Sequence, residues 1–126
     1  MFISISNSNP DPLYKQIKDQ IINAIVTSEL KEGELLPSIR MMANELKTSV
    51  ITIKRAYQDL EAEGYIITRP GLGSYVTSIN KDKLRSEKMV EIREKMKEIV
   101  DEANKYYIDI NELIKILHEI GGDING

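Results

Sequence analysis

Apolar side chains recur three or four residues apart along much of this chain, a spacing that predicts amphipathic helices. The first such stretch starts at Asp11 and runs to about residue 28, and its apolar face consists of Leu13, Ile17, Ile21, Ala24 and Ile25. Two signals mark the start of this helix. The Asp11 side chain can accept a hydrogen bond from a free backbone amide, and Pro12 suits the first helical position, where no donor is needed. Lys15 and Lys18 are predicted to point away from the apolar face.

Two shorter helices are predicted downstream. Ser38 is placed to cap a helix of about nine residues, whose apolar side chains are Ile39, Met42, Ala43 and Leu46. Only Lys47 and Thr48 separate it from Ser49, a second candidate cap. The next apolar stripe ends before Gly64 and consists of Ile53, Ala56, Tyr57 and Leu60. Two helices joined by so short a turn, with an earlier helix to pack behind them, match the helix-turn-helix arrangement.

Short runs of β-forming residues follow at positions 65–69 and 74–77, and the Pro-Gly-Leu-Gly sequence between them suits a tight turn. Three helices followed by a hairpin is the order of a winged helix-turn-helix domain, whose hairpin, the wing, lies along the DNA backbone beside the recognition helix. We therefore predict a mainly α fold with a small β-hairpin, in which residues 1–78 form a winged helix-turn-helix DNA-binding domain.

Beyond residue 80 the pattern changes to alternating charges with an apolar seam. Met89, Ile92, Met96, Ile99, Ala103 and Tyr106 follow one another at intervals of three and four, as in a coiled coil. Asp109 and Glu112 spell a capping box, which predicts a last helix that stops at Gly121. Two helices this short enclose too little volume for a metabolite-binding domain but can pack on each other and on a second copy. Residues 79–126 are therefore predicted to be the two-helix dimerisation tail of a homodimer.

Composition narrows the possible functions. The 126 residues include no cysteine and one histidine, His118, so we expect no disulfide, no thiolate nucleophile, no metal site and no cofactor. No stretch approaches the roughly 18 apolar residues of a membrane span and the N-terminus lacks a signal-peptide pattern, which predicts a cytoplasmic protein. The formal net charge is -3, with 8 basic and 9 acidic groups in residues 1–80. Any phosphate-binding surface must therefore be a local patch.

Several short motifs occur in a fixed order between Glu32 and Val76. They are L-P-S-x-R at 36–40, T-x-x-x-A-Y at 52–57, L-x-x-x-G at 60–64 and G-x-G-x-x-V at 71–76. Together they resemble the DNA-binding domain of the GntR family of transcription regulators. The Pro-Leu-Tyr sequence at 12–14 and the short two-helix tail further resemble the YtrA-type branch of that family. The resemblance implies a winged helix-turn-helix protein that binds double-stranded DNA.

The resemblance also implies which side chains contact DNA. The arginine of P-S-x-R is Arg40, whose planar charged fork can bind a phosphate or a guanine edge. The alternative for Arg40 is a surface ion pair with Glu34 or Glu45. Thr52 and Lys54 match family positions that reach the groove or the DNA backbone.

Three further polar residues have alternative structural roles. Ser38 and Ser49 can touch DNA or cap their helices, and Ser49 can do both by holding a phosphate at the start of the recognition helix. Arg55 can touch a phosphate or pair with Asp59, four residues further along the helix.

The wing and the start of the recognition helix complete the candidate interface. Arg69 is a candidate phosphate contact, and Gly71 permits the positive φ of a turn close to the sugar-phosphate chain, although an ordinary hairpin turn explains this glycine equally well. Val50 and Ile51 stand where the family often has polar residues. Their hydrocarbon side chains can touch thymine methyl groups, which favours an AT-rich operator.

Taken together, these features predict a sequence-specific homodimeric repressor whose two recognition helices enter successive major grooves of an inverted repeat. The alternative is a winged-helix module that associates with another protein without binding DNA, which the acidic balance favours. No nucleophile–base pair, metal cluster or cofactor loop points to an enzyme. The sequence identifies neither the operator nor a small-molecule effector.

Overall fold

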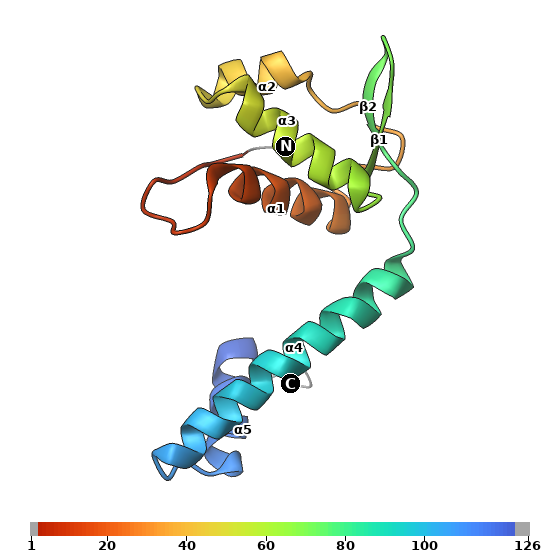
Figure 1. The fold of residues 1–126 in the computed structure, drawn as a ribbon. Helices are drawn as coiled ribbons and strands as arrows, with labels where there is room; N and C mark the ends of the chain where they lie inside the picture. The colour runs from red at the N-terminus through yellow and green to blue at the C-terminus, as the bar shows by residue number, and fades with distance from the viewer. Residues whose placement is uncertain (1–2, 123–126) are drawn as a thin grey trace. The chain divides into compact units, whose positions relative to one another are not determined.

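The structure, a computed structural model, describes residues 3–122 and consists of two compact units with their boundary between Lys81 and Asp82. The elements follow one another as shown in Figure 1: α1 (Leu13–Val26), α2 (Ile39–Leu46), α3 (Val50–Ala62), β1 (Ile66–Arg69), β2 (Gly73–Val76), α4 (Lys81–Lys105) and α5 (Ile110–Gly121). The predicted mainly helical fold with a small β-hairpin is confirmed.

The core of the first unit lies between α1 and α3, which lie next to each other in Figure 1. Ile17 and Ile21 from α1 meet Ile53 and Leu60 from α3, and all four side chains are fully enclosed. Burying an isoleucine or leucine side chain stabilises a fold by roughly 1.5–3 kcal/mol, so this cluster sets the position of α3. The helical apolar stripes predicted for both helices are confirmed.

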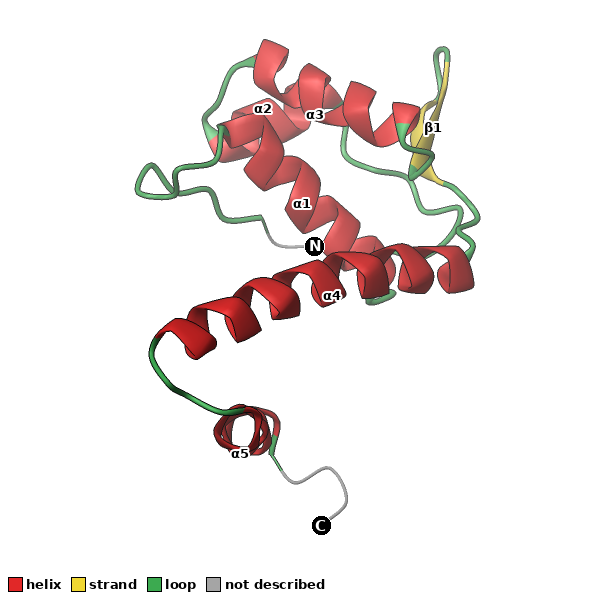
Figure 2. Cartoon of the chain, turned by 60° about the horizontal axis from the view of Figure 1, so that its bottom comes forward, coloured by secondary structure: helices red, strands yellow, loops and turns green. Residues whose placement is uncertain are grey.

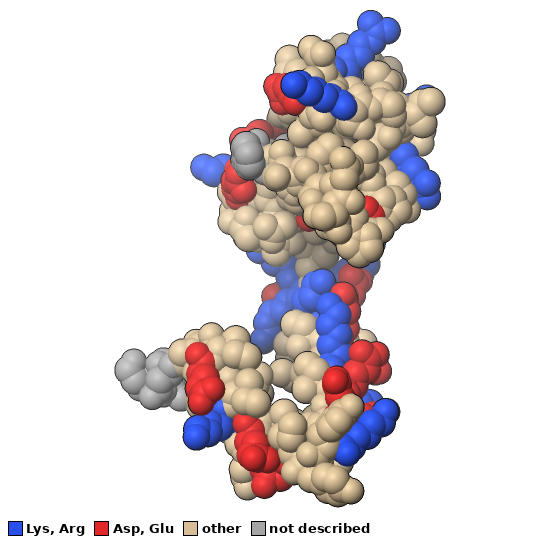
Figure 3. All heavy atoms as spheres, turned by 90° about the vertical axis from the view of Figure 1, so that its left-hand side faces the viewer, with Lys and Arg blue, Asp and Glu red and all other residues tan. Residues whose placement is uncertain are grey.

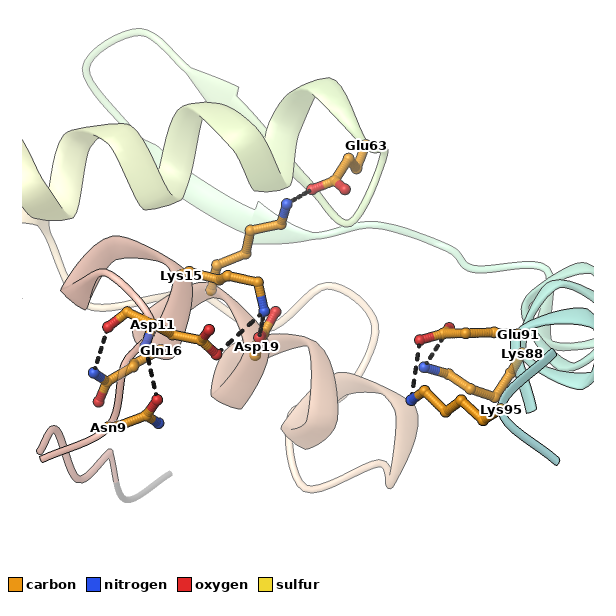
Figure 4. Close-up of polar contacts among 10 residues, drawn as sticks. Asn9, Asp11, Lys15, Gln16, Asp19, Glu63, Lys88, Glu91 and Lys95 are labelled. Atoms are coloured by element: carbon orange, nitrogen blue, oxygen red, sulfur yellow. Dashed lines mark hydrogen bonds and ion pairs between the residues drawn. The ribbon is translucent and has the colours of Figure 1, made fainter. Parts of the chain in front are cut away.

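The start of α1 differs from the prediction. Pro12 is the N-cap and no side chain caps the helix. The carboxylate of Asp11 instead lies 3.4 Å from Nζ of Lys15 (Figure 4). The buried Gln16 explains the difference, because its side-chain amide donates to the Asp11 carbonyl at 2.9 Å and exchanges two hydrogen bonds with the backbone of Ser6. The N-terminal segment is thereby fastened to α1, with Asp11 turned away from the free amides of the helix.

Lys18 of α1, which was predicted to point away from the apolar face, reaches the end of α3. Its Nζ lies 2.6 Å from Oε2 of Glu63, and only 19% of its side-chain surface is exposed. The hydrogen bond to Glu63 raises the pKa of Lys18 and outweighs the opposing effect of burial. This ion pair is a second connection between α1 and α3, beside the apolar core.

Both predicted serine caps of the helix-turn-helix are confirmed. Oγ of Ser38 accepts a hydrogen bond from the backbone N–H of Met41 at 3.1 Å, and Oγ of Ser49 accepts one from that of Thr52 at 3.1 Å. Between the two helices Lys47 has a φ of 52°, in the left-handed region, and ends α2. This one residue turns the chain sharply enough for α3 to begin at Val50, three residues later.

The wing is an antiparallel hairpin in which Ile66 of β1 lies opposite Val76 of β2, and both side chains are buried. A third extended segment, residues 33–36, joins the other edge of β2, where the N–H of Leu36 donates to the carbonyl of Ser74 at 2.8 Å. The sequence analysis predicted no strand pairing for this segment. It anchors the wing to the chain directly ahead of α2.

The second unit contains α5 and nearly all of α4. The predicted capping box is confirmed, because the N–H of Glu112 donates to Asp109 at 2.9 Å and the N–H of Asp109 donates to Glu112 at 3.0 Å. Among the described residues of the two helices, Ala103 alone is buried. No helix within residues 3–122 is long and apolar enough to cross a membrane.

Candidate nucleic-acid interface

The helix-turn-helix presents a shallow hollow where α2 ends and α3 begins. Arg40 from the first turn of α2, Lys47 and Thr48 from the connecting turn, and Val50 from the first turn of α3 all line it. Arg40 and Lys47 are both exposed. The sequence analysis did not include Lys47, although its place in a two-residue turn of a helix-turn-helix was the available signal. Two cations therefore flank the entrance to α3.

The basic side chains of this surface are not neutralised by carboxylates. Within residues 3–122, Arg40 forms no ion pair with Glu34 or Glu45, so the alternative considered for it is not seen. Lys54, like Arg40, is exposed and has no carboxylate partner among the described residues. The cations are thus available to phosphates even though the molecule as a whole is acidic.

Several ion pairs of the described residues involve none of the cations that line this hollow. They join Lys15 to Asp11 and Asp19 in and before α1, Lys18 to Glu63, and Lys88 and Lys95 to Glu91 in α4, as drawn in Figure 4. Figure 3 shows one side of the first unit, where separate Lys and Arg side chains, with a few Asp and Glu side chains among them, stand on largely uncharged surface. The cations near the start of α3 are therefore single exposed residues and not one dense cluster.

Arg55 has a partner that the sequence analysis missed. Its guanidinium carbon lies 3.7 Å from the centre of the Tyr14 ring in the first turn of α1, and in the described chain it forms no ion pair with Asp59. Stacking on an aromatic ring uses the face of the guanidinium and leaves the N–H groups in its plane free to donate. Tyr14 therefore orders Arg55 without consuming the donors that a phosphate would need.

Ser49, Thr52 and Lys54 differ in their contacts and in their exposure to solvent. The hydroxyls of Ser49 and Thr52 lie 2.8 Å apart, and Ser49 also accepts the Thr52 backbone N–H. The side chain of Thr52 is only partly exposed to solvent, whereas that of Lys54 is exposed. The two hydroxyls form a small polar group at the helix start, next to backbone amides that have no partner within the helix.

Arg69 and Gly71 lie in the wing and not in the hollow between α2 and α3. Arg69 ends β1 and lines a second shallow hollow with Leu72 and Tyr75. Gly71 has a φ of 76°, the positive value expected for the turn. Figures 1 and 2 show the tip of the hairpin projecting away from α1. Arg69 and Arg40 therefore line two different hollows of the first unit.

Two of the sequence motifs touch each other through Tyr57. Its hydroxyl donates to the carbonyl of Pro37 at 2.7 Å, so the A-Y motif of α3 meets the L-P-S-x-R motif before α2. Burial of the ring raises the pKa of Tyr57 well above that of a free tyrosine, with a smaller contribution from Glu45. This bond fixes the segment that carries Ser38 and Arg40 relative to α3.

Comparison with known proteins identifies the family of the first unit. Residues 13–76 match the family model described as bacterial regulatory proteins, gntR family. Over 124 residues the chain is 32% identical to the HTH-type transcriptional repressor YtrA of Bacillus subtilis, a match that covers 98% of this chain and 95% of that protein.

Two solved structures are similar over most of their length. A transcriptional antiterminator from Listeria monocytogenes EGD-e has a TM-score of 0.72 and 33% identity, covering 100% of this chain and 94% of that chain. YtrA from Sulfolobus acidocaldarius, a GntR-family transcription factor, has a TM-score of 0.63 and 37% identity, covering 75% of this chain and 96% of that chain. The segment that matches the family model, residues 13–76, contains α1, the helix-turn-helix and the wing. The chain belongs to the GntR family of bacterial regulatory proteins and is a DNA-binding transcription regulator.

Proposed function

We propose that this regulator is a homodimeric repressor that acts in the cytoplasm, where the chromosome lies, and binds an inverted-repeat operator. Each protomer places α3 in a major groove, and a dimer presents two such helices to successive grooves of one face of the duplex. A bound dimer that overlaps a promoter blocks transcription. The repressor YtrA of B. subtilis, similar over nearly the whole chain, supports this direction of control.

The observation that carries the dimer is the exposed apolar seam of the second unit. Met96 and Ile99 of α4 are about half exposed, as are Ile114 and Leu117 of α5. Two isolated helices of this length are marginal in water, because helix stability in proteins comes mainly from packing an apolar face. A second copy that offers the same seam satisfies both faces at once, as in a coiled coil or a four-helix bundle.

We assign each contact with DNA from the element that carries the side chain. Lys54 and Arg55 lie on α3 and are assigned to the major groove and its edge, with Thr52 and Ser49 at the start of the helix. Arg40 flanks that start and is assigned to a phosphate or a guanine, with Ser38 beside it as the cap of α2. In the wing, Arg69 and the turn at Gly71 are assigned to phosphates flanking the half-site.

The test pairs a seam substitution with a matched control on the same helix. Ile99→Glu places a charge in the seam and is expected to convert the dimer to a monomer in analytical ultracentrifugation, with loss of operator binding in a gel shift. Val90→Glu changes an exposed apolar residue of α4 that is off the seam, and it is expected to remain a dimer and to bind. A wild-type chain that binds its operator as a monomer, or an Ile99→Glu variant that stays dimeric, contradicts the proposal.

A further inference from the structure

The helix-turn-helix carries exposed hydrocarbon in the middle of its candidate DNA surface. Ile51, the second residue of α3, is 80% exposed, and Val50 before it is 46% exposed. Met41, in the first turn of α2, is 54% exposed and lines the same hollow as Val50. Single exposed apolar residues are common, but these three occur together where two cations flank the start of the recognition helix.

The geometry of α3 places Ile51 opposite the core. The buried side chains of this helix are Ile53, Ala56, Tyr57 and Leu60. Successive residues of an α-helix are about 100° apart, so Ile51 lies close to the centre of the outer face, between Lys54 and Arg55. When a recognition helix enters the major groove, residues near its N-terminus contact base edges. Ile51 is therefore directed at bases rather than at the DNA backbone.

The charges near Ile51 indicate which kind of partner surface would contact it. Lys54 and Arg55 flank it on α3, and Arg40 and Lys47 line the hollow beside Val50. Within residues 3–122 none of these four cations is paired with a carboxylate. A hydrocarbon centre with a cationic rim is complementary to a groove whose walls are phosphates and whose floor carries an apolar group. The C5-methyl of thymine is the apolar group that the four bases present in the major groove.

We infer that Ile51, with Val50 beside it, is a specificity-determining residue that selects thymine through its C5-methyl group. The inference rests on the proposed function, because it requires α3 to lie in the major groove. Hydrocarbon cannot satisfy the donors and acceptors of the other base edges, so a base of another kind opposite Ile51 is disfavoured by unpaired polar groups as well as by the lost contact. Burial of one methyl-sized group changes affinity about fourfold.

The test removes the methyl group from the DNA without changing base pairing. The operator is first obtained by selecting bound sequences from a random DNA pool with the full-length protein. Each thymine is then replaced by deoxyuridine, at equivalent positions of both half-sites, and affinity is measured by fluorescence anisotropy. At one or two positions the wild-type protein is expected to lose about fourfold in affinity per half-site. Ile51→Ala is expected to bind thymine and deoxyuridine operators equally.

Two comparisons keep the outcomes separate. Val26→Ala changes an exposed apolar residue of α1 and is expected to retain the full sensitivity to deoxyuridine. Deoxyuridine operators that bind wild-type protein as tightly as thymine operators overturn the inference and leave the proposed function intact. The same loss in Ile51→Ala as in wild type also overturns it, because the methyl group then acts through the DNA alone. A protein that selects no sequence at all removes the proposed function itself.

Discussion

Replacement of Arg40 by alanine tests the DNA interface at the residue where sequence and structure agree most closely. Arg40 is exposed, lines the hollow at the start of α3 and has no carboxylate partner in the described part of the chain. Its removal should therefore leave the fold unchanged, because no buried contact or ion pair is lost. Circular dichroism and thermal unfolding of Arg40→Ala are expected to match those of the wild type.

The effect on DNA binding can be worked out from counterion release. If the dimer neutralises on the order of six phosphates, the logarithm of the binding constant falls with the logarithm of the salt concentration at a slope of about -5. Arg40→Ala removes one contact from each protomer and leaves a slope of about -3.6. The same counterion release corresponds to about a thirtyfold loss of affinity at about 0.15 M salt.

The assay is a salt titration of operator binding by fluorescence anisotropy, with Lys115→Ala as the control. Lys115 lies on α5, so its substitution removes the same charge from the chain without touching the helix-turn-helix. A guanine contact by Arg40 gives a different result, namely an unchanged slope and a loss confined to operators that keep the guanine. An Arg40→Ala protein with unchanged affinity and unchanged slope refutes the assignment of Arg40 to either contact.

Three further predictions concern the scaffold that positions these side chains. Tyr57→Phe removes the 2.7 Å hydrogen bond to the Pro37 carbonyl and is expected to lower the free energy of unfolding by roughly 1–3 kcal/mol in a urea titration; an unchanged midpoint contradicts a role for that bond. Gly73→Ala is expected to weaken the wing, because the glycine has a φ of 109° and an added Cβ would lie 2.9 Å from a leucine methyl; thermal unfolding at or above the wild-type temperature refutes this. Lys18→Met is expected to cost less than about 1 kcal/mol at neutral pH. The pKa of Lys18 is raised in the folded state, so the stabilisation by its ion pair is present below the unfolded lysine pKa of about 10.4 and is lost as the pH rises through the folded value. Urea titrations should therefore show a difference in the free energy of unfolding between the two proteins at pH 7 that disappears at pH 12. A difference that grows at high pH contradicts the sign.

Local hydrogen-bonding signals made the helix boundaries predictable. The caps at Ser38, Ser49 and Asp109 are hydrogen bonds between residues three positions apart, so they can be predicted from the local sequence. Asp11 shows where this reasoning fails. The Asp11 side chain had the right chemistry for a cap. The side-chain amide of the buried Gln16, however, donates to the Asp11 backbone carbonyl, and that contact depends on how the N-terminal segment packs.

Long-range contacts account for most of what the sequence did not predict. Residues 33–36 pair with β2 across about forty positions of chain, and no periodicity in so short a segment indicates such pairing. In the same way, Arg55 had a suitable i+4 partner in Asp59, but its guanidinium stacks on Tyr14 instead, because the first turn of α1 lies against α3 there. The candidate DNA residues could be named from motifs, whereas their freedom from carboxylates could be seen only in three dimensions.

Selection of bound sequences from a random DNA pool, followed by determination of the mass of the complex, tests the central claim most directly. The account predicts that the full-length protein enriches two copies of one half-site in inverted orientation, with centres about one helical turn or a multiple of it apart, and that two protomers occupy each duplex. Enrichment of a single unrepeated site bound by one protomer, or no enrichment at all, would contradict a dimeric regulator that reads DNA with α3.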